Sequence, residues 1–159
     1  MTLGQLLDET ARRTPEAAAL ICGESRVSYA ELSQATAALA AWLLAHGLRP
    51  GDRVAIHWSN SIQIASLYFA CFKAGLIAVP INQRLKALEV AYMLAHAEAS
   101  ICFSQRELAP VARQAVEMNG GTIPILTELP GSRHTALPAV DPTAPSAILY
   151  TSGTTARPK

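Results

Sequence analysis

Residues 47–85 read GLRPGDRVAIHWSNSIQIASLYFACFKAGLIAVPINQRL, and this stretch decides the fold. Two short apolar runs, residues 53–58 and 76–81, flank a longer apolar segment, residues 60–75. The short runs have the length and the β-favouring residues of buried strands, and the longer segment has the length of a helix. Asn60 is a good helix-capping residue, and the glycine at the far end of the segment suits a helix end. The stretch therefore predicts a strand, a helix and a second strand in succession.

The same alternation continues on both sides of this unit. Hydrophobic periodicity and capping residues predict helices over 3–13, 28–47, 85–98 and 107–118, strands over 101–104 and 122–127, and a hairpin over 18–28. Strands separated by helices of this length are typical of a parallel sheet. We therefore expect an α/β fold, a mostly parallel sheet with helices on both faces.

The segments differ in composition, and this predicts how the chain is organised. Residues 1–128 carry the alternating pattern and are expected to form one α/β subdomain. Residues 129–145 contain four prolines and lack periodicity, so they are expected to form a surface connection. Residues 146–159 are expected to form a strand and the start of a loop.

The last fourteen residues read SAILYTSGTTARPK and contain the clearest candidate site. The apolar run 147–150 predicts a buried strand that ends in a loop rich in hydroxyl groups. The hydroxyl side chains surround Gly153, and two cations, Arg157 and Lys159, follow. Such a loop suits an anion with several oxygens, because hydroxyls donate to oxygen and glycine lets the backbone approach a ligand. From composition alone, a solvated loop is the alternative.

The order of these residues is more specific than their composition. YTSGTTARPK resembles the YTSGTTGxPK signature of the AMP-forming acyl-CoA synthetases, within the superfamily of adenylate-forming enzymes. Residues 47–85 are similar to the family's GVKPGDRVAI…NS…AFFAVLKAGAVVVPLNPRL pattern. The resemblance implies the N-terminal portion of the adenylate-forming enzyme fold. Ala156 stands where the family usually has glycine, and at a left-handed backbone position alanine costs on the order of 1–2 kcal/mol.

The resemblance also implies a reaction and its cofactors. Enzymes of this family use ATP and Mg²⁺ to join a carboxylic acid to AMP, and then pass the acyl group to a thiol, usually that of coenzyme A. Carried over by position, the residues expected to bind the phosphates of ATP are Thr151, Ser152, Gly153, Thr154, Thr155 and Lys159. Arg84, which follows the strand 76–81, is a candidate contact for a phosphate of coenzyme A, with a solvated turn as the alternative. No catalytic residue and no metal ligand is expected among these 159 residues.

Other parts of the family's machinery are expected downstream of Lys159, in a C-terminal part of the same protein. The chain therefore looks truncated, and we expect it to be inactive by itself. A non-catalytic nucleotide-binding module and a half-fold that docks onto another polypeptide stay open as alternatives. The carboxylic acid, the thiol acceptor and assembly into a homo-oligomer also stay open, as does luciferase-like or peptide-synthetase adenylation chemistry.

Composition excludes several other classes. A net charge of +1 with 16% charged residues argues against a nucleic-acid binder. The sequence has neither a signal-peptide pattern nor an apolar run long enough to span a membrane. Cys22, Cys71 and Cys102 show no pairing pattern, which predicts three reduced, buried thiols in a cytoplasmic protein. The absence of GxGxxG argues against a dinucleotide-binding oxidoreductase. His57, at the end of the strand 53–58, is interpreted as a structural residue.

Overall fold

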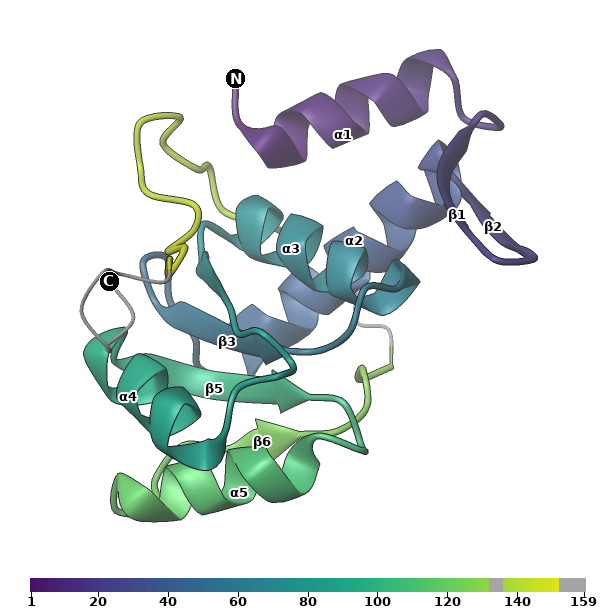
Figure 1. Cartoon of the computed structure of the whole chain (residues 1–159). Helices are drawn as coiled ribbons and strands as arrows, with labels where there is room; N and C mark the ends of the chain where they lie inside the picture. The colour runs from purple at the N-terminus through teal and green to yellow at the C-terminus, as the bar shows by residue number, and fades with distance from the viewer. Residues whose placement is uncertain (132–135, 152–159) are drawn as a thin grey trace. The chain divides into compact units, whose positions relative to one another are not determined.

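The computed structural model describes residues 1–131 and 136–151, and Figure 1 shows the arrangement of its elements. In chain order these are α1 (Leu3–Arg13), β1 (Ala18–Cys22), β2 (Ser25–Ser28), α2 (Tyr29–Ala45), β3 (Arg53–His57), α3 (Ile62–Ala74), β4 (Ile77–Pro80), α4 (Ala87–His96), β5 (Ala99–Ser104), α5 (Ala109–Met118) and β6 (Ile125–Leu126). Each expected helix and each strand up to residue 127 is present, with ends that differ by a few residues. The α/β fold class is confirmed.

The chain divides into two compact units, and each is discontinuous in sequence. The first, here called the helical unit, comprises Met1–Gly51, Asn60–Leu76 and Leu129–Ser146. The second, here called the sheet unit, comprises Asp52–Ser59, Ile77–Glu128 and Ala147–Lys159. The expected limits of one subdomain over 1–128 and a connection over 129–145 stay a prediction.

In the helical unit, α1, α2 and α3 pack against one another, and the hairpin β1–β2 contacts α2. Gly4 of α1 lies close to α3, because a Cβ at this position would be 2.9 Å from Cγ of Lys73. The cap of α3 is Ser61, one residue after the expected Asn60: its hydroxyl accepts a hydrogen bond from the amide of Ile64 at 3.4 Å. Gly75 ends α3 in a left-handed conformation (φ 71°), as the sequence predicts.

A buried cation links the three helices of this unit. The side chain of Lys73 is 3% exposed, and its ammonium donates to the carboxylate of Asp8 and to the carbonyl (2.9 Å) and hydroxyl (3.0 Å) oxygens of Ser33. The Ser33 hydroxyl in turn donates to Asp8 at 2.5 Å. All three ammonium hydrogens therefore have acceptors, which is the condition for burying a lysine.

The sheet unit contains a parallel four-stranded sheet in the order β4-β3-β5-β6. In the register, Ile56 of β3 lies opposite Pro80 of β4 and Phe103 of β5. The helices α4 and α5 pack on this sheet through an apolar cluster that includes Val90, Leu94 and Ala112. Burying these side chains contributes about 1.5–3 kcal/mol for each of the larger ones.

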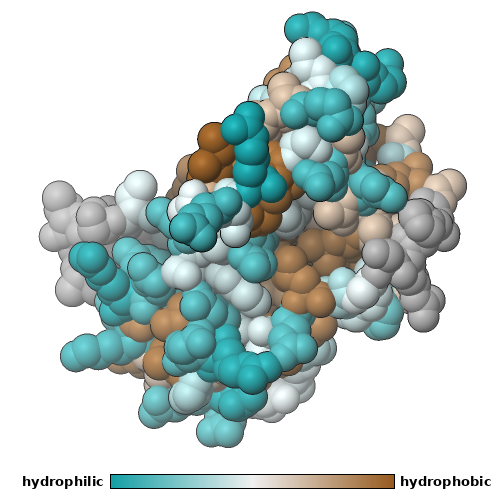
Figure 2. Space-filling view, turned by 90° about the vertical axis from the view of Figure 1, so that its right-hand side faces the viewer, coloured by the Kyte–Doolittle hydropathy of each residue, from teal (hydrophilic) through white to brown (hydrophobic). Residues whose placement is uncertain are grey.

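The surface mixes polar and apolar side chains. On the face drawn in Figure 2, hydrophobic residues (brown) lie among hydrophilic ones (teal). The large apolar side chains that are exposed come from both units: Met1, Leu3, Leu6, Ile21, Leu88, Met118 and Leu149. Within the residues described, no helix combines the length and the hydropathy that crossing a membrane requires.

Two expectations about burial are wrong. Residues 147–150 do not form a buried strand: a single parallel bridge joins Ala147 to Ala78, and Leu149 is 69% exposed. This segment pairs at the edge of the sheet beside β4, so the sheet offers it only one neighbouring strand. Cys22 is exposed, because it is the last residue of β1 next to the hairpin turn, whereas Cys71 and Cys102 are buried.

These burials predict the reactivity of the thiols. Burial raises the pKa of Cys71 and of Cys102 to about 12, so both stay protonated at pH 8 and unreactive toward thiol reagents. We expect one thiol, that of Cys22, to react rapidly in the native protein, and the other two to react only in denaturant. Mass analysis after alkylation under both conditions measures this, and rapid native labelling of Cys71 would contradict it.

Candidate functional site

The carboxyl edge of the parallel sheet is where the candidate site lies. In open α/β sheets, ligands bind beyond the carboxyl ends of the strands. Here these ends are Pro80 of β4, His57 of β3, Ser104 of β5 and Leu126 of β6. The polar residues at or just after these ends come from different parts of the sequence, and the parallel pairing brings them to one edge.

Hydrogen bonds tie the ends of β3 and β5 together. The amide of Gln105 donates to the carbonyl of His57 at 3.0 Å. The side-chain oxygen of Gln105 accepts from both the amide (3.1 Å) and the hydroxyl (2.5 Å) of Ser59. The geometry therefore fixes the two loops that follow the central strands.

His57 is fully buried at this edge. Its Nδ1 lies 3.3 Å from the hydroxyl of Ser104, and its Nε2 has no hydrogen-bond partner among the described residues. Burial lowers the pKa of this imidazole, because the charged form would lose its hydration. His57 is therefore a neutral, buried side chain in the folded protein, and the interpretation of it as structural agrees with this environment.

This environment predicts how stability changes with pH. Below about pH 6.5 the unfolded chain takes up a proton at His57 that the folded chain does not, so the free energy of unfolding falls as pH falls. We expect the wild type to lose more free energy of unfolding than a His57→Leu variant between pH 7 and pH 5, by at most about 2 kcal/mol, the limit for an imidazole that stays neutral in the folded protein. Urea unfolding of both proteins across this range measures the difference, and parallel pH profiles would contradict it.

Arg84 follows the carboxyl end of β4. The side chain of Asn82 accepts a hydrogen bond from the Arg84 amide at 2.9 Å, which fixes a tight turn after the buried Ile81. Arg84 itself is exposed. Its guanidinium is accessible to an anion, and its contact with a phosphate of coenzyme A stays a prediction.

Thr151, the first residue of the hydroxyl-rich loop, follows the segment that pairs with β4. Ala147 lies opposite Ala78 in the parallel direction, and the amide of Ile148 donates to the carbonyl of Ala78 at 2.9 Å. The chain therefore runs from this bridge toward the carboxyl edge, and Thr151 is exposed. The other expected phosphate-binding residues, Ser152, Gly153, Thr154, Thr155 and Lys159, lie outside the described residues, as do Ala156 and Arg157.

A contact that sequence reasoning missed lies directly before this loop. The Tyr150 hydroxyl is 2.8 Å from Nδ1 of His96, the last residue of α4. The two residues are 54 positions apart, and no local pattern signals their pairing. Only the spacing of Tyr92 and His96, which places both on one side of α4, was available from the sequence.

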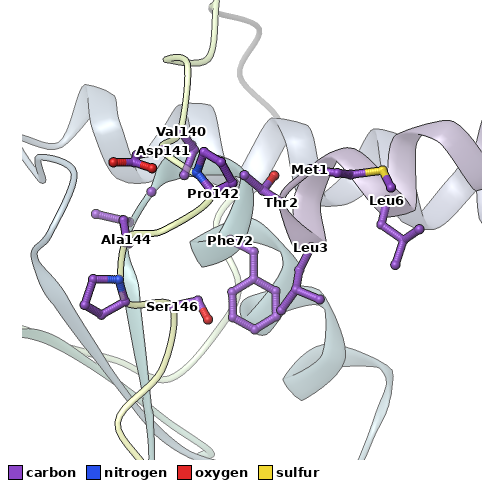
Figure 3. Close-up of a pocket in the computed structure, with 13 residues that line it drawn as sticks. Met1, Thr2, Leu3, Leu6, Phe72, Val140, Asp141, Pro142, Ala144 and Ser146 are labelled. Atoms are coloured by element: carbon purple, nitrogen blue, oxygen red, sulfur yellow. The ribbon is translucent and has the colours of Figure 1, made fainter.

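A separate cavity of about 190 Å³ lies in the helical unit. Figure 3 shows Leu3 and Phe72 on one side of it and Val140, Ala144 and Ser146 on the other. The Asp141 carboxylate, which also lines it, accepts hydrogen bonds from the amide and hydroxyl of Thr143, and these bonds lower its pKa. Since its walls are mainly apolar and its acid is engaged in a turn, the cavity has no arrangement suited to catalysis.

Comparison with known proteins gives one family. The model of the family described as "AMP-binding enzyme" matches residues 7–159. A feruloyl-CoA synthase from Amycolatopsis is 35% identical over an alignment of 162 positions, which covers 99% of this chain and 32% of the relative. A fatty acid–[acyl-carrier-protein] ligase, ScoC, from Streptomyces coeruleorubidus is 34% identical over an alignment of 165 positions, which again covers 99% of this chain and 32% of the relative. The chain thus spans about a third of the length of these curated relatives.

Solved structures give the same fold. The o-succinylbenzoate CoA synthetase of Bacillus subtilis, in complex with the acyl-adenylate intermediate OSB-AMP, superposes with a TM-score of 0.84 at 27% identity. The alignment covers 100% of this chain and 41% of that one. The similarity in both sequence and structure therefore extends over the whole chain.

Proposed function

Because this chain belongs to the family of AMP-binding enzymes, the adenylate-forming enzymes, we propose that it forms the N-terminal part of an acid–thiol ligase. This ligase activates a carboxylic acid with ATP to an acyl-adenylate and then transfers the acyl group to coenzyme A. The observation that supports the proposal most is the hydroxyl-rich sequence from Thr151 to Lys159, whose first residue follows a segment that is bridged to β4 and runs in parallel to it toward the carboxyl edge of the sheet.

The proposed chemistry has two steps. In the first, a carboxylate oxygen attacks the α-phosphorus of ATP, the bond to the β-phosphate oxygen breaks, and pyrophosphate leaves. In the second, a thiol sulfur attacks the acyl carbon, the bond to AMP breaks, and the thiol proton is released to solvent or a base. Both steps depend on alignment of the reacting groups and on stabilisation of charge on phosphate oxygens.

In this proposal the residues of the chain position phosphate oxygens. The hydroxyls of Thr151, Ser152, Thr154 and Thr155 donate to these oxygens, and Gly153 allows the backbone amides to approach them. The ammonium of Lys159 attracts the β- and γ-phosphates. None of these groups needs to transfer a proton.

Magnesium is the metal that neutralises ATP in reactions of this kind. Residues 1–131 and 136–151 contain no group of three His, Cys, Asp or Glu side chains that could hold a metal ion. The proposal assigns no residue of this chain to the metal, and none of its steps passes through it.

The identity of the thiol acceptor is a more specific part of the proposal than the adenylation step. One relative is named for coenzyme A and another for an acyl-carrier protein. We favour coenzyme A because Arg84 is an exposed cation just beyond the carboxyl end of β4, and coenzyme A carries phosphates that a guanidinium can bind. In steady-state kinetics of the full-length protein, Arg84→Ala should raise the KM for coenzyme A and leave the KM for ATP unchanged.

A screen of the full-length protein tests the proposal. Pyrophosphate exchange into ATP is measured with a panel of aliphatic and aromatic carboxylic acids, and the best acid is then supplied with coenzyme A or with an acyl-carrier protein. We expect acid-dependent exchange and an acyl-CoA product. ATP binding without exchange for any acid would favour a non-catalytic nucleotide-binding module, and acyl transfer only to the carrier protein would overturn the choice of coenzyme A.

A further inference from the structure

His96 and Tyr150 form an aromatic contact at the C-terminal end of α4. Their ring centroids are 5.7 Å apart in an edge-to-face arrangement, and the Tyr150 hydroxyl is 2.8 Å from Nδ1 of His96. The ring of Tyr92, one helical turn earlier, stacks on His96 with centroids 5.4 Å apart. The Tyr150 ring also packs on the apolar cluster between the sheet and α4. Tyr150 is therefore held through both its hydroxyl and its ring.

Backbone pairing holds this segment only weakly. Between the sheet and the described residues 147–151, the structure has one parallel bridge, Ala78 with Ala147, and one backbone hydrogen bond, from Ile148 to Ala78. Leu149 is 69% exposed and Thr151 is exposed as well. A regular strand would add a backbone hydrogen bond for every second residue, so the side chain of Tyr150 carries much of the remaining attachment.

We infer that His96 is a positioning residue that acts through Tyr150 to fix the start of the hydroxyl-rich loop. The inference rests on the proposed function for the role of the loop in binding ATP. Thr151 follows Tyr150 directly, so a shift of the tyrosine ring moves the first hydroxyl that would contact phosphate. A displacement of about 1 Å is enough to weaken a reaction that depends on alignment.

The hydrogen bond can form with either tautomer of His96. The tyrosine hydroxyl can donate to the lone pair of a neutral imidazole, and it can accept from an Nδ1–H group.

Hydrogen exchange of the Ile148 amide tests the attachment without ATP. In the full-length protein, His96→Leu and Tyr150→Phe should each speed up this exchange by about fivefold, the effect of losing one hydrogen bond. The double variant should exchange no faster than His96→Leu alone, because Tyr150→Phe removes only the hydrogen bond that His96→Leu already removes. His96→Asn, whose side chain can hydrogen-bond from nearly the position of Nδ1, should restore slow exchange.

His46→Leu is the matched control. His46 directly follows α2, and its ring stacks on that of Trp42 with centroids 3.6 Å apart. Its Nδ1 lies 2.8 Å from the carbonyl oxygen of Trp42. The His46→Leu variant therefore loses the same kinds of contact, but in the helical unit. In this variant the Ile148 amide should exchange as in the wild type. Unchanged exchange in His96→Leu, or failure of His96→Asn to restore it, would overturn the inference.

Titration with MgATP then separates the inference from the proposed function. The His96→Leu and Tyr150→Phe variants should bind MgATP about threefold to tenfold more weakly, with thermal unfolding close to that of the wild type. If the wild type itself fails to bind MgATP, the proposed function fails, while accelerated exchange in the variants still supports the attachment. Accelerated exchange with unchanged MgATP affinity would overturn the positioning role.

Discussion

Replacing Lys159 by alanine in the full-length protein is expected to slow acyl-adenylate formation by about 10–1000-fold. The reason is electrostatic: in the proposed reaction, negative charge moves onto the departing pyrophosphate, and the ammonium of Lys159 would stabilise it. The change removes a cation from a loop rich in hydroxyl groups, so folding should be nearly unaffected. The measurement is pyrophosphate exchange with the most active acid of the screen, together with a thermal unfolding curve.

Arg113→Ala is the control for this experiment. Arg113 is an exposed cation on α5, and its loss changes the net charge by the same amount. Exchange should then proceed at the wild-type rate. If the Lys159→Ala variant is folded and its pyrophosphate exchange is unaltered, the lysine has no phosphate-binding role.

The fold was largely predictable because its determinants are local. Within residues 47–85, the apolar runs and Gly75 specify the two strands, the helix between them and the end of that helix, and each of these is present. The parallel sheet follows from the alternation of strands and helices. The order β4-β3-β5-β6 does not follow from it, because the choice of neighbouring strand depends on packing between residues far apart in sequence.

The candidate site was predictable only in part, for the same physical reason. The motif pointed to Thr151 as the start of the loop, and the structure puts this residue beyond a bridge to β4. The apolar run before it led to the wrong prediction of a buried strand. Apolar residues at a sheet edge with one neighbouring strand need not be buried, as Leu149 illustrates. The contact of His96 with Tyr150 joins residues 54 positions apart and has no periodic signal. Long-range polar pairs of this kind become visible only in three dimensions.

The buried lysine of the helical unit leads to the second large effect. Asp8→Ala should lower the free energy of unfolding by about 2–4 kcal/mol, because it leaves the ammonium of Lys73 buried without its counter-charge. The value lies toward the lower part of the usual range for a broken buried pair, since the Asp8 side chain is 44% exposed and water can reach part of the space it leaves. Alanine is the better helix former at this position of α1, so helix propensity would act in the opposite direction.

Removing the other partner should be much less harmful, and this asymmetry is the sharper test. Lys73→Met replaces a side chain that is 3% exposed by an apolar one of similar length, and the Asp8 carboxylate keeps both its water and its hydrogen bond from Ser33. We expect a loss of about 1 kcal/mol, and the double variant Asp8→Ala/Lys73→Met should be more stable than Asp8→Ala alone. Glu9→Ala is the control, since Glu9 lies on the same helix and takes part in none of the ion pairs among the described residues. Urea unfolding of the four variants measures these differences. If Lys73→Met proved as destabilising as Asp8→Ala, the loss would come from packing around the lysine stem and not from an unpaired buried charge.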